Sequence, residues 1–261
     1  MIYTCYEMMR DCRANRPEGW RFLVVQYVPA IRGIVRHYGA KEAALAETEA
    51  ETLASVARPD SPWFASFDPA PERVFVAGLR QSILERIPAP AADLRVSLET
   101  VAAALEPLTL AEKQAAWLES MGYGTEESGA MLRMAPTTVA AIRARAAELL
   151  RGKTDAWRPS LLAENGRALG SEAAPSAEGC LPPKKFLDII DGRATWAGRE
   201  ELARHTEACW HCIDHFCRLV EVVSLLRGIQ PLSEAEAEPF YRALNLAAPK
   251  AAGWKRWFAT K

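Results

Sequence analysis

Apolar residues recur three to four positions apart along most of the chain, a spacing that predicts helices rather than strands. In residues 21–39 the larger apolar residues fall near one helical face; they are Phe22, Val25, Ile31, Ile34 and Val35. Pro29 is expected to interrupt or kink this helix, and Gly39 to end it. Residues 40–57 are rich in strong helix formers, and residues 72–87 again space their apolar side chains for a helix. Because strand-like alternation is rare, the pattern predicts an all-α fold.

A second block of helical pattern covers residues 105–152, where Gly122, Gly124 and Pro136 interrupt it. Pro136 and Thr137 occupy the first positions of a last helix, which we expect to reach about residue 151. Two short helices joined by a tight turn, the second ending in arginines, form a helix-turn-helix pattern.

The chain of 261 residues is long enough for two or three small domains. Segments rich in proline, glycine and small polar residues separate the helical blocks, so we predict that they are linkers. The predicted division is a helical domain over 1–87, a linker over 88–106, a helix-turn-helix domain over 107–156, a linker over 157–179, a cysteine-rich helical domain over 180–230 and a tail over 231–261.

Charge and hydropathy exclude some classes of protein. The net charge is −1, and residues 1–160 carry 19 lysines and arginines against 20 acidic residues, so no excess of positive charge indicates nucleic-acid binding. The first residues lack the apolar run of a signal peptide, and no uncharged apolar stretch of about 18 residues predicts a membrane-spanning helix. We therefore expect a cytoplasmic protein.

Metal ligands gather in the last third of the chain. Four of the six cysteines and three of the four histidines lie between residues 180 and 217. In a chain of this length, such clustering indicates metal binding in a reducing compartment rather than a disulfide scaffold.

Helical spacing separates these candidates. If residues 200–226 are helical, His205, Cys209 and Cys212 fall within roughly 60° of one another. One imidazole and two thiolates suit tetrahedral zinc, which needs a fourth ligand. Cys180, just before the first helix of this block, can fold back to supply it. The predicted zinc ligands are Cys180, His205, Cys209 and Cys212.

The remaining candidates have other expected roles. His211 and His215 share a different helical face and are expected to be a solvated or partner-facing pair. Cys217 stands apart, where it either packs as a small apolar residue or serves as a redox thiol that pairs with a ligand cysteine after zinc loss. The alternative for the whole cluster is that the cysteines are merely buried and the histidines exposed.

The pattern of Cys180 followed by His205-x3-Cys209-x2-Cys212, with FLDIIDG between its two parts, resembles the zinc-binding anti-sigma domain of bacteria. The 25 positions from Cys180 to His205 fit the spacing in that family, and the resemblance covers about 50 residues. It implies a domain that binds a sigma factor and blocks its contact with RNA polymerase. In some members, zinc loss under oxidation releases the sigma factor.

The preceding blocks are similar to extracytoplasmic-function sigma factors. Residues 64–87 resemble the stretch that leads from an FDP-like turn into the helix reading the −10 promoter element, and residues 40–56 resemble the acidic polymerase-binding helix. Residues 108–152 are similar to sigma region 4, with Thr138 and Val139 where its recognition helix opens. The resemblance implies three small helical domains: a sigma region 2-like bundle, a region 4-like helix-turn-helix and the zinc domain.

The recognition helix departs from the family at two positions. Where basic residues are usual it has Ala140 and Ile142, which offer no donor to bases or phosphates. The residues left as candidate DNA contacts are Thr137, Thr138, Arg143 and Arg145. The alternative is a core helix that buries its apolar residues, namely Val139, Ile142, Leu149 and Leu150.

The functional expectation is a sigma-like transcription regulator whose fused zinc domain docks within the chain and autoinhibits it, with RNA polymerase core and promoter DNA as partners. A second hypothesis is a degenerate sigma-like decoy or scaffold without specific DNA binding. A third is a redox sensor that uses Cys217. We expect no enzyme, since four protein ligands leave zinc no open position. The tail places Trp254, Trp257 and Phe258 among cationic residues, which suits either contact with a membrane interface or a surface helix.

Overall fold

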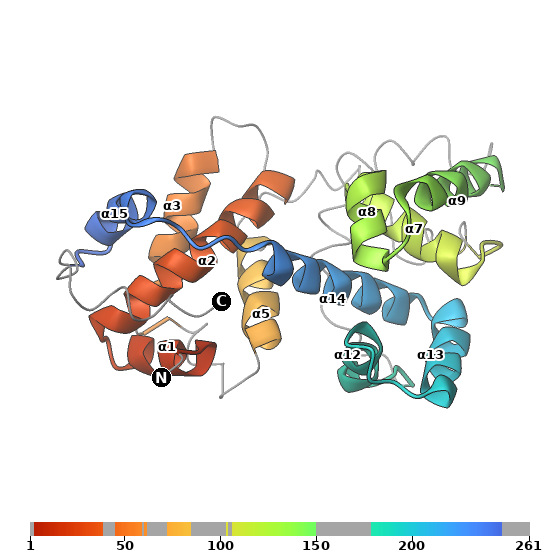
Figure 1. Cartoon of the computed structure of the whole chain (residues 1–261), viewed down its shortest axis with the longest axis horizontal. Coiled ribbons are helices and arrows are strands. Elements are labelled where there is room, and N and C mark those ends of the chain that lie inside the picture. Colours follow the sequence, from red (N-terminus) through yellow and green to blue (C-terminus); the bar gives the residue numbers. More distant parts are fainter. Residues whose placement is uncertain are drawn as a thin grey trace. The chain divides into compact units, whose positions relative to one another are not determined.

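The computed structural model describes residues 3–38, 45–58, 60–61, 72–84, 103, 106–149 and 179–246. Within these ranges the regular structure consists of α-helices without a strand, which confirms the predicted all-α fold (Figure 1). None of the helices in the described ranges is long and apolar enough to cross a membrane. The predicted linkers over 88–106 and 157–179 lie almost wholly outside the described residues, and so do the tail aromatics at 254, 257 and 258.

The chain divides into two compact units. The first comprises Met1–Ile87 and Leu225–Lys261, and the second comprises Pro88–Ser224. The predicted helix-turn-helix and cysteine-rich domains therefore lie largely in one unit, and the end of the chain belongs to the other. The predicted three-domain architecture is not confirmed.

The first unit is built around one long helix. Its elements are α1 (Cys5–Arg13), α2 (Pro17–Tyr38), α3 (Leu45–Val56), α5 (Glu72–Leu84) and α15 (Glu234–Ala243). The other four helices all pack against α2, which is buried along most of its length. Pro29 lies inside α2 without ending it. Helix α15 lies within the predicted tail over 231–261.

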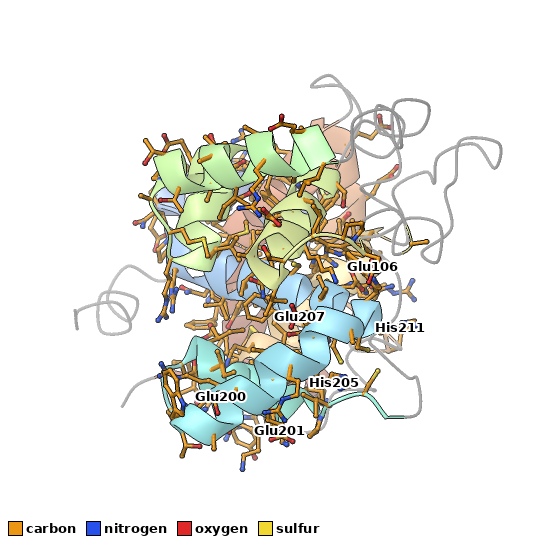
Figure 2. All side chains as sticks on the ribbon, turned by 90° about the vertical axis from the view of Figure 1, so that its right-hand side faces the viewer. Glu106, Glu200, Glu201, His205, Glu207 and His211 are labelled. Carbon is orange, nitrogen blue, oxygen red and sulfur yellow. The ribbon has the colours of Figure 1, made fainter. Side chains whose placement is uncertain are left out.

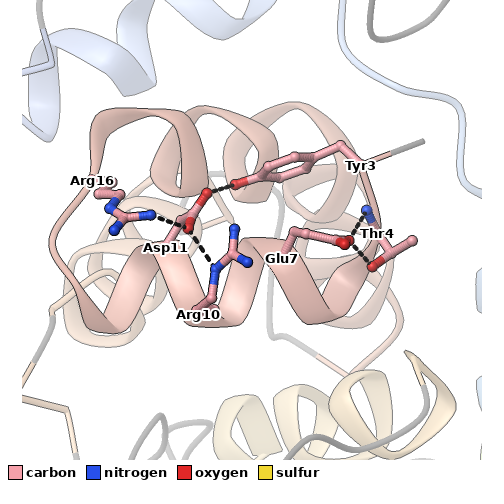
Figure 3. Close-up of polar contacts among 6 residues, drawn as sticks. All are labelled: Tyr3, Thr4, Glu7, Arg10, Asp11 and Arg16. Atoms are coloured by element: carbon pink, nitrogen blue, oxygen red, sulfur yellow. Dashed lines mark hydrogen bonds and ion pairs between the residues drawn. The ribbon is translucent and has the colours of Figure 1, made fainter. Parts of the chain in front are cut away.

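Polar contacts fix α1 at the start of this unit (Figure 3). Thr4 and Glu7 form a capping box, in which the backbone N–H of Thr4 donates to Glu7 Oε2 at 2.8 Å. The carboxylate of Asp11 is buried and accepts hydrogen bonds from three side chains, those of Tyr3, Arg10 and Arg16. Because Arg16 lies just before α2, these bonds join α1 to the start of the central helix.

The second unit is built from two sets of helices with α14 between them (Figure 1). One set is α7 (Leu110–Ser120), α8 (Thr125–Leu132) and α9 (Pro136–Leu149); the other is α12 (Pro183–Ile190) and α13 (Trp196–Ala208). Helix α14 (Trp210–Gly228) follows α13 after a break at Cys209, and its last turn belongs to the first unit.

One hydrophobic core joins the two sets. Its buried members come from both predicted domains: Leu108, Trp117, Leu118, Met121, Tyr123, Ala146, Ile190, Ile213, Cys217, Val220 and Val223. Apolar burial is the main favourable term in folding, so a core of this kind holds residues 108–146 and 190–223 together as one body.

The turn between α8 and α9 requires a glycine. Arg133 ends α8 in the left-handed region, and the backbone N–H of Met134 returns to the carbonyl of Gly129 at 2.9 Å. A Cβ on Gly129 would lie 2.9 Å from the Met134 carbonyl oxygen, closer than such contacts allow.

We therefore expect Gly129→Ala to lower the free energy of unfolding by about 1–3 kcal/mol, because the turn must open to admit the methyl group. Gly228→Ala is the control, since a Cβ there meets nothing within 4 Å. Thermal and urea unfolding of the two variants measure this. Equal stability of both variants would contradict the tight turn.

Candidate metal centre

Three cysteines from separate elements converge in the second unit. Cys180 precedes α12, Cys209 occupies the break between α13 and α14, and Cys212 lies in the first turn of α14. Gly179, in front of Cys180, has a φ of +93°, a conformation that favours glycine. Together these three residues are called the thiol cluster.

The break at Cys209 is a hydrogen-bonded turn of the backbone. Its backbone is extended, with φ −117° and ψ 102°, while its N–H still donates to the His205 carbonyl at 3.0 Å. The N–H groups of Cys212 and Ile213 both return to the Cys209 carbonyl, each at 3.1 Å. The turn therefore presents the Cys209 and Cys212 side chains to the same point.

The three sulfurs lie within 4.8 Å of one another, with Cys180 Sγ 3.9 Å from Cys209 Sγ. A tetrahedral ion with metal–sulfur bonds of about 2.3 Å separates its sulfurs by about 3.8 Å. His205 adjoins the group through Cys212, with Nε2 3.1 Å from Cys212 Sγ. Figure 2 shows His205 on α13 beside the first turn of α14. The thiol cluster can therefore hold a metal ion.

A small apolar cluster supports the thiols. Phe186, Leu202 and Cys212 are buried together, and Cys180 and Cys209 pack against them half-buried. Burial raises the pKa of the Cys212 thiol to about 12, and the neighbouring Cys209 acts in the same direction. Since a thiolate is the metal ligand, a bound cation must displace protons here.

The other histidines and Cys217 lie outside the thiol cluster. His211 is exposed, whereas His215 is buried and its ring meets Phe186 edge-on at 5.1 Å. The expectation that these two histidines form a solvated or partner-facing pair is therefore wrong for His215, which is buried because α14 is covered by helices on two sides. Cys217 is fully buried in the shared core, and burial raises its pKa well above the usual range. This placement favours packing over a redox role.

Helix α7 holds the turn that carries two of the thiols. The ammonium group of Lys113 donates to the Glu207 carbonyl at 2.7 Å, in the last turn of α13. It also lies 5.3 Å from the ring centroid of Trp210, within cation–π range. The Trp210 ring in turn lies 5.4 Å from that of Trp117. The residues flanking Cys209 are therefore in contact with α7.

A polar stripe on α14, formed by Asp214, Arg218 and Glu221, also faces these helices. The indole N–H of Trp117 donates to Asp214 Oδ1 at 3.0 Å, and the Tyr123 hydroxyl donates to Glu221. Arg218 lies 2.6 Å from Asp214 Oδ2. All three stripe residues are buried, so their charges must be met by partners within the protein.

Sequence reasoning missed Lys113, Trp117 and Tyr123. A signal for their partners exists, since positions 214, 218 and 221 share one helical face of an otherwise apolar segment. Charges at such positions require buried partners, but the spacing does not name them.

The candidate DNA contacts all lie on α9 but differ in their surroundings. Thr137 and Thr138 are exposed at the start of α9. The Arg143 guanidinium instead donates to the Tyr123 carbonyl and to Ser128 Oγ, each at 2.8 Å. Arg143 therefore has a structural role in the helix-turn-helix.

Arg145 is exposed, and its Nε lies 2.9 Å from Glu112 Oε1. The remaining outward positions on α9 include three alanines, at 140, 141 and 144. The alternative of a core helix is right for Val139, which is fully buried, but wrong for Leu149, which is 43% exposed. Ile142 is half-buried. Leu150 lies outside the described residues. The outward face of α9 is thus small and nearly neutral.

Comparison of the chain with family models, with curated proteins and with solved structures yields no match.

The geometry of the thiol cluster indicates which cysteines would bind a metal ion. Substituting serine for Cys180, Cys209 or Cys212 should lower affinity for Zn²⁺ at least about hundredfold, because each supplies one bond that the others cannot replace. Cys217→Ala on the same helix is the matched control and should retain parental affinity. Competition with a chromophoric chelator measures this, and similar losses in all four variants would contradict the assignment.

His215 makes stability pH-dependent. Burial, together with the charge of Arg218, lowers its pKa to about 4, so between about pH 6.5 and pH 4 the unfolded chain binds more protons. The free energy of unfolding should therefore decrease as the pH is lowered through this window. His215→Gln should lose this part of the pH dependence, whereas His211→Gln, at an exposed position, should follow the parent. Urea unfolding at pH 7, 5.5 and 4.5 tests it, and parallel pH profiles for all three proteins would refute the assignment.

Proposed function

We propose that the protein is a sigma-factor-like transcription regulator whose C-terminal part is a zinc-dependent inhibitory module fused in the same chain. Residues 107–149 would be the region 4-like element that engages RNA polymerase. Residues 180–224 would be the anti-sigma-like element that covers it.

The shared core of the second unit carries this proposal. An inhibitory module must occupy the surface that its target uses, and it must do so specifically. Here α14 buries Ile213, Cys217 and Val220 with α7 residues, and its polar stripe pairs with Trp117 and Tyr123. Buried polar pairs add little net stability, but they penalise every other register.

Zinc fits the donor set of the candidate centre. Three cysteines and one histidine form a common structural zinc set, and such a site contributes directly to folding. In the proposal, Cys180, Cys209, Cys212 and His205 are the ligands. Cys180 would tie α12 to the turn between α13 and α14, so that zinc keeps the module in the shape that fits α7.

The last part of the chain makes a comparable contact within the first unit. After α14, the chain continues into α15, which packs on α2. Residues 180–224 and 225–246 thus contact one sigma-like block each, each within its own unit. This supports a module that restrains both blocks of a regulator.

The proposal predicts that disturbing the shared core increases polymerase binding. Ile213→Asp places a charge in the apolar contact and should weaken docking, because a buried unpaired charge is strongly unfavourable. His211→Asp adds the same charge at an exposed position two residues away. Capture of bacterial RNA polymerase core by the full chain should rise at least tenfold for I213D and stay at the parental level for H211D.

Amide exchange of α7 in the same samples shows whether docking has been lost. An I213D protein with an exposed α7 and no gain in polymerase capture would overturn the proposed function.

A second candidate is a sigma-like decoy or scaffold that binds polymerase without reading DNA. The observation that favours it is the recognition helix, where Arg143 is bound internally, Arg145 is ion-paired and the outward face carries alanines. Phosphate contacts need several cations on one face. In this case I213D captures polymerase but does not retain duplex DNA at low salt, whereas salt-sensitive retention would favour the first candidate.

A further inference from the structure

Pro29 removes one hydrogen bond from the middle of α2. In an α-helix each backbone N–H donates to the carbonyl four residues earlier, so a proline at this position leaves the Val25 carbonyl without its helical donor. Val25 is only 2% exposed, which limits replacement of that donor by water. The backbone N–H of Leu232 donates to this carbonyl instead, at 3.0 Å.

Three positions on α2 form a strip that suits close approach of a second chain segment. Val25, Pro29 and Gly33 are four residues apart and therefore share one face of the helix. The carbonyl of Val25 lacks a donor from within α2, and Gly33 has no side chain. Leu225 uses that space, since its Cδ2 lies 3.6 Å from where a Cβ on Gly33 would stand.

The hydrogen bond lies where the chain enters α15. Leu232 is buried and precedes Ser233, which caps α15 with Glu236; the Ser233 N–H donates to Glu236 Oε2 at 2.9 Å. Ala237 and Tyr241 are then buried as α15 packs on α2. The Leu232 N–H thus fixes the starting point of a helix whose apolar face follows at once.

We propose that the strip of Val25, Pro29 and Gly33 is a docking site for a non-helical backbone segment, and that its occupant is residues 229–232 of the same chain. Through this site α2 holds residues 225–246, called the clasp. The site recognises one backbone N–H beside an apolar side chain. The docking itself does not require the function proposed above. Its interpretation as a reversible restraint on the first unit rests on that function.

The test uses a substitution that ordinarily strengthens helices. Pro29→Ala restores the internal hydrogen bond of α2 and gives the Val25 carbonyl a new donor. The Leu232 amide should then exchange with solvent at least about tenfold faster than in the parent, as expected for the loss of one buried hydrogen bond. Amides of α3 and α5 serve as an internal reference and should not accelerate.

Pro239→Ala is the matched control, because Pro239 also lies inside a helix of this unit but is exposed. Restoring a helical N–H there should leave exchange of the Leu232 amide unchanged or slower. Unchanged protection of Leu232 in P29A would overturn the proposal.

A double-mutant cycle isolates the hydrogen bond itself. Leu232→Pro removes the same donor, so its effect on exchange of the α15 amides should be about tenfold smaller in the P29A background than in the parent. Fully additive effects would show that the two positions do not interact and would overturn the docking site. A chain that fails to bind polymerase would leave these exchange results unchanged, so the two failures are distinguishable.

Discussion

Trp117 is the side chain on which the second unit depends. It is fully buried, and an indole N–H in that position requires an acceptor. Asp214 provides one from α14, but a buried carboxylate in turn needs a cation, and Arg218 lies one helical turn further on. These contacts join the three groups where α14 packs against α7. The apolar core makes association of the helices favourable. The buried polar contacts of Trp117, Asp214 and Arg218 favour this register of the helices over others.

The same register determines where the thiol cluster lies. Cys209 and Cys212 flank Trp210, whose ring lies beside that of Trp117 and near the Lys113 ammonium. Contacts with α7 therefore stabilise the turn that presents the thiols, and a metal ion bound by the thiols would stabilise the same turn. Two sites that stabilise one turn are thermodynamically linked, so the state of the thiols affects docking and docking affects the thiols to the same extent. This linkage is the physical basis for the proposal that the cluster belongs to a regulatory contact.

A feature of the structure could be predicted from the sequence where neighbouring residues in the chain determine that feature. The all-α class followed from periodicity. Spacing predicted that Cys209 and Cys212 lie together, whereas Cys180 was included because its place before a helix allows it to fold back toward them. The break at Cys209 was not predicted, because the local sequence favours helix on both sides and only the three-dimensional turn reveals it. His215 was misplaced for the same reason, since burial of α14 on two sides is a tertiary property.

The basic residues show the same limit. Arg143 has the spacing of a DNA contact, yet its side chain is used to hold the helix-turn-helix together through Tyr123 and Ser128. A charge pattern on one helix cannot show which arginines its neighbours will engage. Helix α15 was not predicted for another reason: its short apolar face packs on α2, at a sequence distance of about two hundred residues.

The central claim is that the helix-turn-helix and α14 are docked through specific buried contacts. The most direct measurement is a double-mutant cycle between Trp117→Phe and Asp214→Ala, with free energies of unfolding from urea titrations of the full chain. The account predicts a coupling of about 1–3 kcal/mol, because the two substitutions remove the same buried hydrogen bond. Effects that add within about 0.3 kcal/mol would contradict it, because that is the behaviour of residues that do not touch.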